Sequence, residues 1–484
     1  MSLSVPWVGG PEATLDLRGN RGALTGEAAK ALLAERLAAC GGAGAPERAV
    51  LSTWAFSEDA AREVAAALAA MPRLRSAVLS DMIAGRPEAE GLAVYRALCA
   101  ALTAPPGAAE GGGGAACERL EELDLSDNAV GTKGVEAWRP LLLALPRLRR
   151  LFFCNCGISA EAARAIADCL APGGRETALR VLHFDNNMSG GAGAAAVGDI
   201  AAASPQLEDL RFTSSRGDRA GVDALCRGVG AARALRRLDL PDTIFAEPLG
   251  AALGAALAAG RLAQLTFLDL GDTLLRDAGV AALASGLVRG CASSLEHLDL
   301  SVNEVTPEGA RAVGRCVRRL ARLRVLLLHE NELEDEGALC VARALRRRRE
   351  GRRRVAKTAG VSCDDGDDPL EVLDLSENML TDASVGALAR ASAAAGLARL
   401  TRLGVARNDE LTRKGLARAR AALAAGGLGA ASLGEIDEDE LEEGGEGGDG
   451  GGGADEAAGD DDADSETDNG AADALADALA AAKV

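Results

Sequence analysis

The chain has 484 residues with 72 acidic and 53 basic side chains, a formal net charge of −19. Its length allows about three domains, and its 48% hydrophobic content excludes a mostly disordered chain. The acidic balance and the 2% aromatic content argue against nucleic-acid binding, which rests on basic side chains and base stacking. No stretch offers ~20 uninterrupted apolar residues, and Met1 to Gly10 lack a basic n-region, so we expect neither membrane insertion nor a secretory signal.

The thiol and imidazole side chains give little support to a metal site or a histidine-based catalytic site. Eleven cysteines are scattered without a CxxC pair, and only three histidines occur. An odd number of scattered cysteines favours reduced thiols inside a cell over a disulfide framework. We therefore expect no metal site.

A pattern LxxLxL, followed by two residues and often Asn, recurs along the chain. Three looser copies come first: ATLDLRGN ending at Asn20, RAVLSTW ending at Trp54, and LRSAVLSDMIAGR beginning at Leu74. The regular copies begin at Leu120, Leu148, Leu179, Leu207, Leu235, Leu265, Leu295, Leu323, Leu370 and Leu400. Most copies start 28 to 31 residues apart, and two longer spacings contain insertions near 102–119 and 346–369.

Each copy joins a short strand pattern to an Ala- and Leu-rich stretch with helical spacing, such as AEAARAIADCL up to Leu170. One unit cannot bury its own apolar face, so the units must stack on one another. The repeat predicts an α/β leucine-rich-repeat solenoid of about thirteen repeats. This ribonuclease-inhibitor-like horseshoe has an inner parallel β-sheet and outer helices.

The sequence predicts four segments. They are a short N-terminal extension at 1–11, the leucine-rich-repeat domain at 12–430, an acidic disordered tail at 431–470 and a short C-terminal helix at 471–484. Residues 435–469 contain seventeen acidic and no basic side chains. That stretch therefore carries −17, and the rest of the chain carries about −2 of the total −19.

Two columns of the repeat differ in their expected roles. Position 9 of each unit, most often Asn, is expected to hydrogen-bond the backbone of the neighbouring coil. Trp54 and Met82 break this pattern, so we expect the second and third units to be irregular. Position 8 lies just past the strand and is expected to need no particular residue. Its members from the third unit on are Asp81, Asp127, Asn155, Asn186, Ser214, Asp242, Asp272, Val302, Glu330 and Glu377.

Six of those ten position-8 residues are carboxylates, spaced by roughly 4.8 Å from strand to strand. The row is either a solvated rim or a docking edge for a basic partner. Asn155 stands out because its neighbour Cys156 fills position 9, which leaves Asn155 without the usual structural duty of Asn. Arg86, in SDMIAGR, is either a clamp for phosphate or carboxylate or a solubilising surface charge. No phosphate-binding loop and no Ser/His/Asp arrangement is present, so any catalytic effect is expected on a partner.

The residues LSDMIAGRPEAEGL (Leu79–Leu92), LEELDLSDNAVGTKG, FFCNCGISAEAARA and VLHFDNNMSG resemble the Ran GTPase-activating protein family, its plant and algal branch most closely. The resemblance runs from about Leu15 to Leu423 and includes the acidic tail. It implies an activator of GTP hydrolysis by the small GTPase Ran, in support of nucleocytoplasmic transport. Such a protein is not an enzyme by itself.

The same resemblance implies roles for individual residues. The family is understood to use an asparagine to position Ran's own catalytic glutamine without an arginine finger, and that residue maps to Asn155. Arg86 maps to the supporting arginine. The residues expected to bind the partner are Asp81, Asp127, Asp185, Asp242, Asp272 and Glu330.

The expected partner is Ran–GTP, with a Ran-binding protein as an optional third component. The protein is expected to need no cofactor, because GTP and Mg²⁺ belong to the GTPase. We expect a monomer in the cytoplasm, with a perinuclear position as the alternative. No N-terminal envelope-targeting domain is seen, which argues against tethering to the nuclear envelope. Two alternatives remain: a binding scaffold or inhibitor, and an acidic chaperone of basic proteins. The Arg-rich stretch 343–357 is either a nuclear import signal or a disordered surface loop.

Overall fold

The computed structural model describes residues 14–20, 22–42, 44–104, 115–291, 293–359, 368–408, 410–429, 431–436 and 441–442, with only the backbone from 349 to 359. The predicted N-terminal extension, most of the acidic tail and the closing helix lie outside the described residues, so those segment boundaries stay predictions.

Parallel strands form one long sheet in which each strand pairs with the next along the chain, apart from the short strands β2 and β4. Its thirteen strands are β1 (Thr14–Asp16), β3 (Arg48–Val50), β5 (Ser76–Val78), β6 (Glu122–Asp124), β7 (Arg150–Phe152), β8 (Val181–His183), β9 (Asp209–Arg211), β10 (Arg237–Asp239), β11 (Phe267–Asp269), β12 (His297–Asp299), β13 (Val325–Leu327), β14 (Val372–Asp374) and β15 (Arg402–Gly404). A second, two-stranded sheet pairs β2 (Ala23–Leu24) with β4 (Ala55–Phe56).

One helix follows each unit's strand and covers the outer side of the sheet. The helices are α1 (Gly26–Ala39), α2 (Glu58–Ala69), α3 (Glu88–Thr103), α4 (Gly131–Leu142), α5 (Ala160–Leu170), α6 (Gly190–Ala202), α7 (Arg219–Val229), α8 (Glu247–Ala258), α9 (Arg276–Gly290), α10 (Pro307–Val317), α11 (Glu334–Ala359), α12 (Asp382–Ala395) and α13 (Arg413–Ala425). Two 3₁₀ turns, η2 (Ala116–Glu118) and η3 (Pro172–Gly174), precede β6 and β8.

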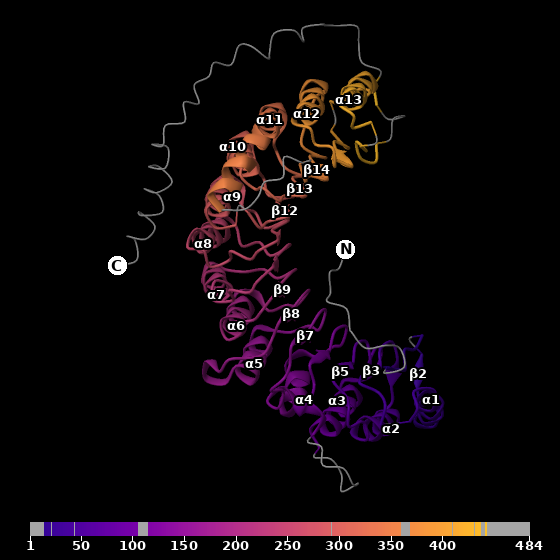
Figure 1. Cartoon of the computed structure of the whole chain (residues 1–484). Helices are drawn as coiled ribbons and strands as arrows, with labels where there is room; N and C mark the ends of the chain where they lie inside the picture. The colour runs from indigo at the N-terminus through magenta and orange to yellow at the C-terminus, as the bar shows by residue number, and fades with distance from the viewer. Residues whose placement is uncertain are drawn as a thin grey trace.

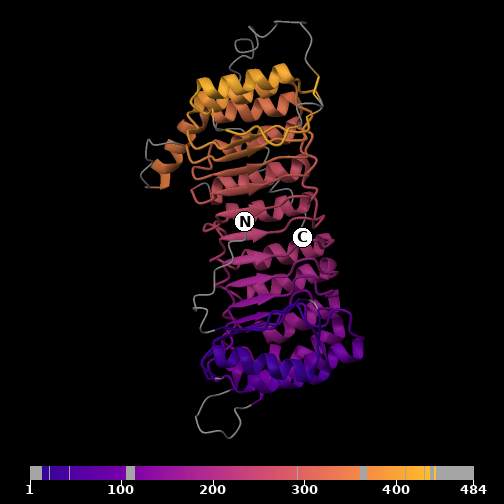
Figure 2. The same cartoon turned by 90° about the vertical axis from the view of Figure 1, so that its right-hand side faces the viewer.

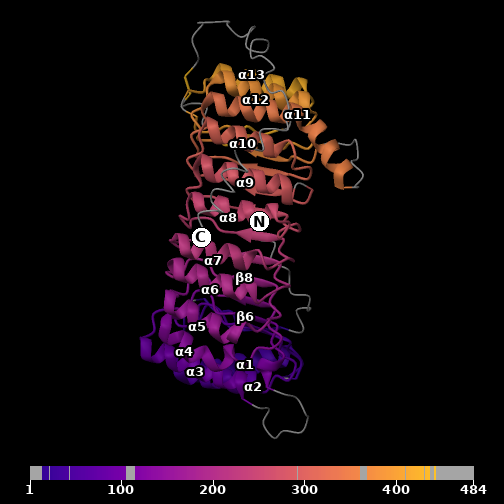
Figure 3. The ribbon, with the colours of Figure 1, turned by 90° about the vertical axis from the view of Figure 1, so that its left-hand side faces the viewer.

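The elements form an arc with strands on the concave side and helices on the convex side (Figure 1). Figure 2 shows the molecule from the side of the strands, and Figure 3 shows it from the side of the helices. The predicted α/β solenoid of thirteen repeats is therefore confirmed. Among the described residues, no helix has the length and apolar content needed to cross a membrane.

The core lies between each strand and its own helix. In the unit of β6, Leu120, Leu123 and Leu125 are fully buried, and Leu123 pairs with Leu151 of β7. Equivalent leucines stack from coil to coil, so each unit covers the apolar face of the previous one. Helices approach closely where side chains are small: a Cβ on Gly228 of α7 would overlap the carbonyl oxygen of Gly198 in α6.

The position-9 column bonds neighbouring coils as predicted. Asn128 donates to the carbonyl oxygens of Leu79 (2.7 Å) and Leu125 (2.9 Å), and it accepts from the backbone N–H of Met82 (2.9 Å). Trp54 departs from the Asn pattern but keeps its bond, because its indole N–H donates to the carbonyl of Leu17 at 2.7 Å. An indole donor reaches the same kind of backbone acceptor that an Asn amide reaches elsewhere. The irregularity expected of the second unit is present as strand β4, which pairs with β2 of the first unit.

The Arg-rich insertion departs from the expected surface loop, because α11 continues as a helix to Ala359. Arg348 is fully buried, and its Nε lies 2.9 Å from both carboxylate oxygens of Asp368. Its other guanidinium nitrogens donate to the carbonyls of Val317 (2.6 Å) and Leu323 (3.0 Å). Since residues 348 and 368 flank the insertion on either side, this pair joins its two ends to the solenoid.

Candidate functional site at the strand ends

The position-8 residues all lie at the edge of the sheet where the strands end, and we call them the strand-end row. From Asp81 to Glu377 every member has a left-handed backbone, with φ between 49° and 58°. No structural requirement was expected at this position, whereas the structure shows one, a left-handed backbone. Asn and Asp tolerate this conformation better than other non-glycine residues, so part of their enrichment in the row has a backbone cause. Val302, Glu330 and Glu377 lack that conformational advantage.

Asn155 is exposed in the middle of a hydrogen-bonded trio of side chains. Its Nδ2 donates to Oδ1 of Asp127 at 3.1 Å, and its Oδ1 accepts from Nδ2 of Asn186 at 3.2 Å. Its backbone N–H donates to the carbonyl of Asp185 at 2.9 Å. The trio fixes the orientation of the Asn155 amide and still leaves one N–H and one oxygen lone pair for a partner. Asn155 is therefore held in place from both sides.

Cysteines flank Asn155 in the chain on both sides, Cys154 before it and Cys156 after it. The Cys156 thiol donates to the carbonyl of Leu125 at 3.1 Å, and its backbone N–H donates to Oδ1 of Asn187 at 3.1 Å. Burial raises the pKa of the Cys154 thiol to about 12 and also raises the pKa of Cys156. Both thiols are protonated at neutral pH, so they act as packing and hydrogen-bonding groups and are not nucleophiles.

Asp185 lies next to the strand-end row and is half-buried. Its Oδ2 lies 3.5 Å from the Cys154 thiol, which donates to it. Burial raises the pKa of the Asp185 carboxyl. Its position favours support of the Asn155 turn over direct contact with a partner.

Arg86 lies in the loop between β5 and α3, and only 20% of its side chain is exposed. Nη2 donates to the carbonyl of Ala55 at 2.6 Å, and Nη1 lies 3.3 Å from Oε1 of Glu90. The guanidinium therefore ties its own loop to β4. This geometry suits a supporting residue better than a side chain that extends into a partner.

The remaining acidic candidates occupy the same edge as predicted. Asp242, Asp272 and Glu330 are exposed, whereas Asp81 is half-buried and donates its backbone N–H to the carbonyl of Ser126 at 3.1 Å. Glu377 pairs with Arg407 at 3.0 Å, which neutralises that end of the row.

A second acidic row on the concave face escaped the sequence analysis. Asp239, Asp269 and Asp299 are in register on β10, β11 and β12. Burial and the neighbouring Asp299 and Asp239 carboxylates raise the pKa of Asp269 to about 7. The triplet LDL recurs in three successive units, and this recurrence could have predicted the row of aspartates. Beside it, the guanidinium of Arg237 lies 3.5 Å from the centre of the Phe267 ring.

We expect Asp269→Asn to stabilise the fold at pH 8 but not at pH 4. The pKa of Asp269 is higher in the folded chain than the ordinary 3.8. The stabilising contribution of the protonated Asp269 carboxyl is therefore fully present below about pH 4 and is lost as the pH rises through about 7. Above that pH the folded chain holds a buried charge, which the uncharged Asn side chain avoids. Burial lowers the pKa of the nearby His297 to about 4, which acts in the opposite direction. The test is the difference in unfolding temperature between variant and wild type at both pH values. An equal difference at pH 4 and pH 8 would contradict the prediction.

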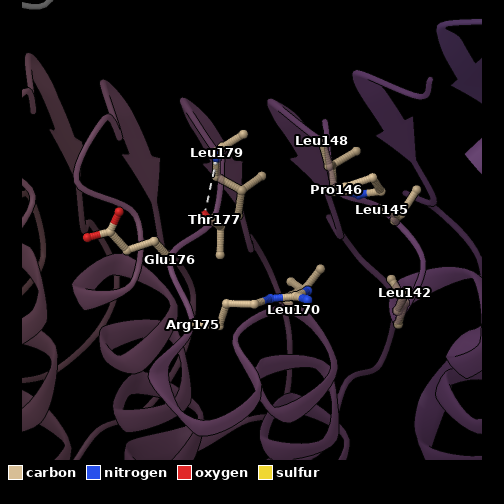
Figure 4. Close-up of a pocket in the computed structure, with 10 residues that line it drawn as sticks. Leu142, Leu145, Pro146, Leu148, Leu170, Arg175, Glu176, Thr177 and Leu179 are labelled. Carbon is tan, nitrogen blue, oxygen red and sulfur yellow. Dashed lines mark hydrogen bonds between the residues drawn. The ribbon is translucent and has the colours of Figure 1, made fainter. Parts of the chain in front are cut away.

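A hollow lies on the opposite edge of the solenoid, where helices end and strands begin (Figure 4). It has a volume of ≈ 250 Å³ and is lined by Leu142, Leu145, Pro146, Leu148, Leu170, Arg175, Glu176, Thr177, Ala178 and Leu179. None of the candidate residues reaches it. In the part of the chain that the structure describes, no cluster of three or more His, Cys, Asp or Glu could hold a metal ion.

Comparison with known proteins now adds to this geometry. The family model described as "Leucine Rich repeat" matches residues 116–137 and 291–314. Two curated proteins of Arabidopsis thaliana are similar over 102 residues: RAN GTPase-activating protein 1 at 36% identity and RAN GTPase-activating protein 2 at 37%. The chain thus has the leucine-rich-repeat fold, and 102 of its residues are similar to two Ran GTPase-activating proteins of Arabidopsis.

The similarity to these two proteins is partial. It covers 21% of this leucine-rich-repeat protein and only 17% and 16% of the relatives' own lengths. A chain in the crystal structure of the yeast Rad7 and Elc1 complex has a TM-score of 0.38 and 17% identity over 74% of this chain and 84% of that one. An internalin of Listeria monocytogenes (InlF) has a TM-score of 0.34 and 14% identity over 69% of this chain and 80% of that one. At these scores neither structure carries an argument about function.

Proposed function

We propose that this protein is a GTPase-activating protein for Ran. The observation that carries the proposal is the exposed Asn155 amide, held between Asp127 and Asn186 on the strand-end row. The partial similarity to two plant Ran GTPase-activating proteins supports the same reading. The protein would act as an activator, with GTP and Mg²⁺ supplied by Ran–GTP and no cofactor of its own.

In the proposed mechanism, the Asn155 amide uses its remaining N–H and lone pair to hold the catalytic glutamine of Ran. That glutamine orients the attacking water, so the activator contributes positioning and not a new reactive group. Because the Asn155 amide is already oriented by its neighbours, it loses little conformational entropy when the partner binds. Arg86 supports this site through its bond to the Ala55 carbonyl, and no arginine finger is needed.

The acidic residues of the strand-end row would orient Ran through long-range attraction to its basic groups. Asp242, Asp272 and Glu330 are exposed and are the main candidates for this role. The protein would act as a monomer in the cytoplasm or near the nuclear envelope, in support of nucleocytoplasmic transport. A Ran-binding protein is the proposed optional third component, and the assay is run with and without it.

Single-turnover GTP hydrolysis by Ran, measured with and without the protein, tests the proposal. We expect acceleration at sub-stoichiometric amounts of the protein. No acceleration would refute the activator function, and tight binding without acceleration would instead support a scaffold or inhibitor. Tight binding of histones together with no effect on Ran would support an acidic chaperone.

The double substitution Asp242→Asn/Asp272→Asn is expected to slow association with Ran by ~3- to 10-fold at low salt, because two charges that steer the encounter are lost. The difference should shrink at high salt, where screening already weakens the attraction. Stopped-flow binding at several ionic strengths measures this effect. Glu377→Gln is the matched control, since Arg407 already neutralises that carboxylate. A salt-independent effect would contradict the steering role.

A further inference from the structure

Apolar side chains form a short line beside the strand-end row. Position 10 of three units is occupied by Met188, Ile244 and Leu274, and we call these three residues the apolar rim. Met188 is 86% exposed and Ile244 is 38% exposed. Each follows a member of the strand-end row by two residues, namely Asn186, Asp242 and Asp272. The apolar rim therefore lies along the same edge as Asn155.

The backbone is unfavourable at two of the three residues of the apolar rim. Ile244 has a φ of 43° and Leu274 a φ of 57°, both in the left-handed region. A β-branched or bulky residue is an outlier there. Gly157 occupies the same position in the unit of Asn155 with a φ of 63°, where glycine has no steric penalty. Glu304 and Met379 share this backbone at position 10, with φ values of 53° and 56°, so the conformation belongs to the repeat. At Ile244 both the left-handed backbone and the exposure of the apolar side chain oppose stability.

The apolar rim has definite ends. Towards the N-terminus it begins one coil after Asn155, beside Asn186. Towards the C-terminus it stops where Glu304 and Glu332, both exposed, take position 10 of the next two units. Within it, the exposed Arg216 occupies position 10 between Met188 and Ile244. The line thus begins in the unit next to Asn155 and runs along the acidic Asp242 and Asp272.

We propose that the apolar rim is the apolar part of the docking surface for the GTPase. It would pack on an exposed apolar patch of Ran that lies next to the basic groups facing Asp242 and Asp272. This proposal rests on the proposed function. Apolar anchors surrounded by charged side chains are the usual arrangement in protein interfaces, and a few such anchors carry most of the affinity. The carboxylates would set orientation, and Met188 and Ile244 would supply affinity.

The test uses Met188→Ser and Ile244→Gly in the full chain. For each variant, single-turnover hydrolysis by Ran is measured over a range of activator concentrations. We expect the half-maximal concentration to rise by about 5- to 30-fold while the maximal rate stays within about twofold, because only docking is weakened. Ile244→Gly should also keep or raise the unfolding temperature, since it relieves the left-handed strain.

Met379→Ser is the matched control. Met379 is 53% exposed at position 10 of the unit of β14, beyond Glu304 and Glu332, with a φ of 56°. It should leave the half-maximal concentration unchanged. The docking role of the apolar rim would be refuted if Met188→Ser and Met379→Ser changed the half-maximal concentration equally. It would also be refuted if neither Met188→Ser nor Ile244→Gly changed it, while the wild-type protein still accelerated hydrolysis. Absence of acceleration by the wild-type protein would instead refute the proposed function.

Discussion

Replacing Asn155 by Ala is expected to lower the maximal rate of Ran GTP hydrolysis by ~10²- to 10³-fold, the usual effect of removing one preorganised hydrogen-bonding group from a transition state. The half-maximal activator concentration should change by less than about threefold, because a single exposed amide adds little to a large interface. Single-turnover assays at saturating activator measure the first quantity. Full activity of Asn155→Ala would refute the asparagine mechanism and leave the activator function intact.

Control variants separate the amide from the backbone at this position. Asn155 has a φ of 53°, where Ala is strained, so Asn155→Gly removes the side chain and keeps the turn. It should be as inactive as the Ala variant and unfold at the same temperature as wild type. Asn186→Ala removes the donor to the Asn155 oxygen and is expected to cost a smaller factor of ~10. Activity of Asn155→Gly near the wild-type level would show that the turn, and not the amide, matters.

The repeat fold was predictable because its cause is local and periodic. In the ten regular units, positions 1, 4 and 6 hold buried apolar side chains, most of them leucines, and Asn128 makes the backbone bonds that its column predicts. The strand-end row was predictable as an edge but not as a conformation. Recognising its left-handed turns would have required reading the Asp and Asn bias as a backbone preference, which the acidic charge concealed.

The side-chain partners at the candidate site could not be predicted. Whether Asn155 lies within reach of Asp127 and Asn186 depends on how three consecutive coils stack, and no local pattern encodes that distance. Trp54 is a second example in which a side-chain partner could not be predicted, because an unexpected residue supplies the bond normally made by Asn. In both cases the function of a residue is decided by the geometry of its neighbouring coils.

Arg348 looked like one charge in a basic run, although helical spacing does distinguish it. Ala338, Val341 and Leu345 are fully buried in α11, and position 348 continues that face. The four consecutive arginines at 346–349 concealed which one points inward. The chain thus places a fully buried guanidinium where the repeat would otherwise place an apolar side chain, and Asp368 is the residue that makes this possible.

We expect Arg348→Met to lower the free energy of unfolding by about 3–5 kcal/mol, the usual cost of leaving one member of a buried ion pair without its partner. The loss also leaves the Val317 and Leu323 carbonyls without this donor. Hydrogen exchange should show the effect around β13, β14 and α11, because contacts in a solenoid are confined to neighbouring units. Urea unfolding gives the magnitude.

Arg347→Met is the matched control, since Arg347 is exposed one residue earlier in the same helix and should change stability by less than about 0.5 kcal/mol. The double variant Arg348→Met/Asp368→Asn is expected to lose less free energy of unfolding than the two single variants together. The reason is that Asp368→Asn removes the buried charge that Arg348→Met leaves without a partner. Equal losses for the Arg347 and Arg348 variants would mean that the guanidinium of Arg348 adds nothing beyond the hydrocarbon part of its side chain. The insertion would then be attached to the solenoid by packing alone.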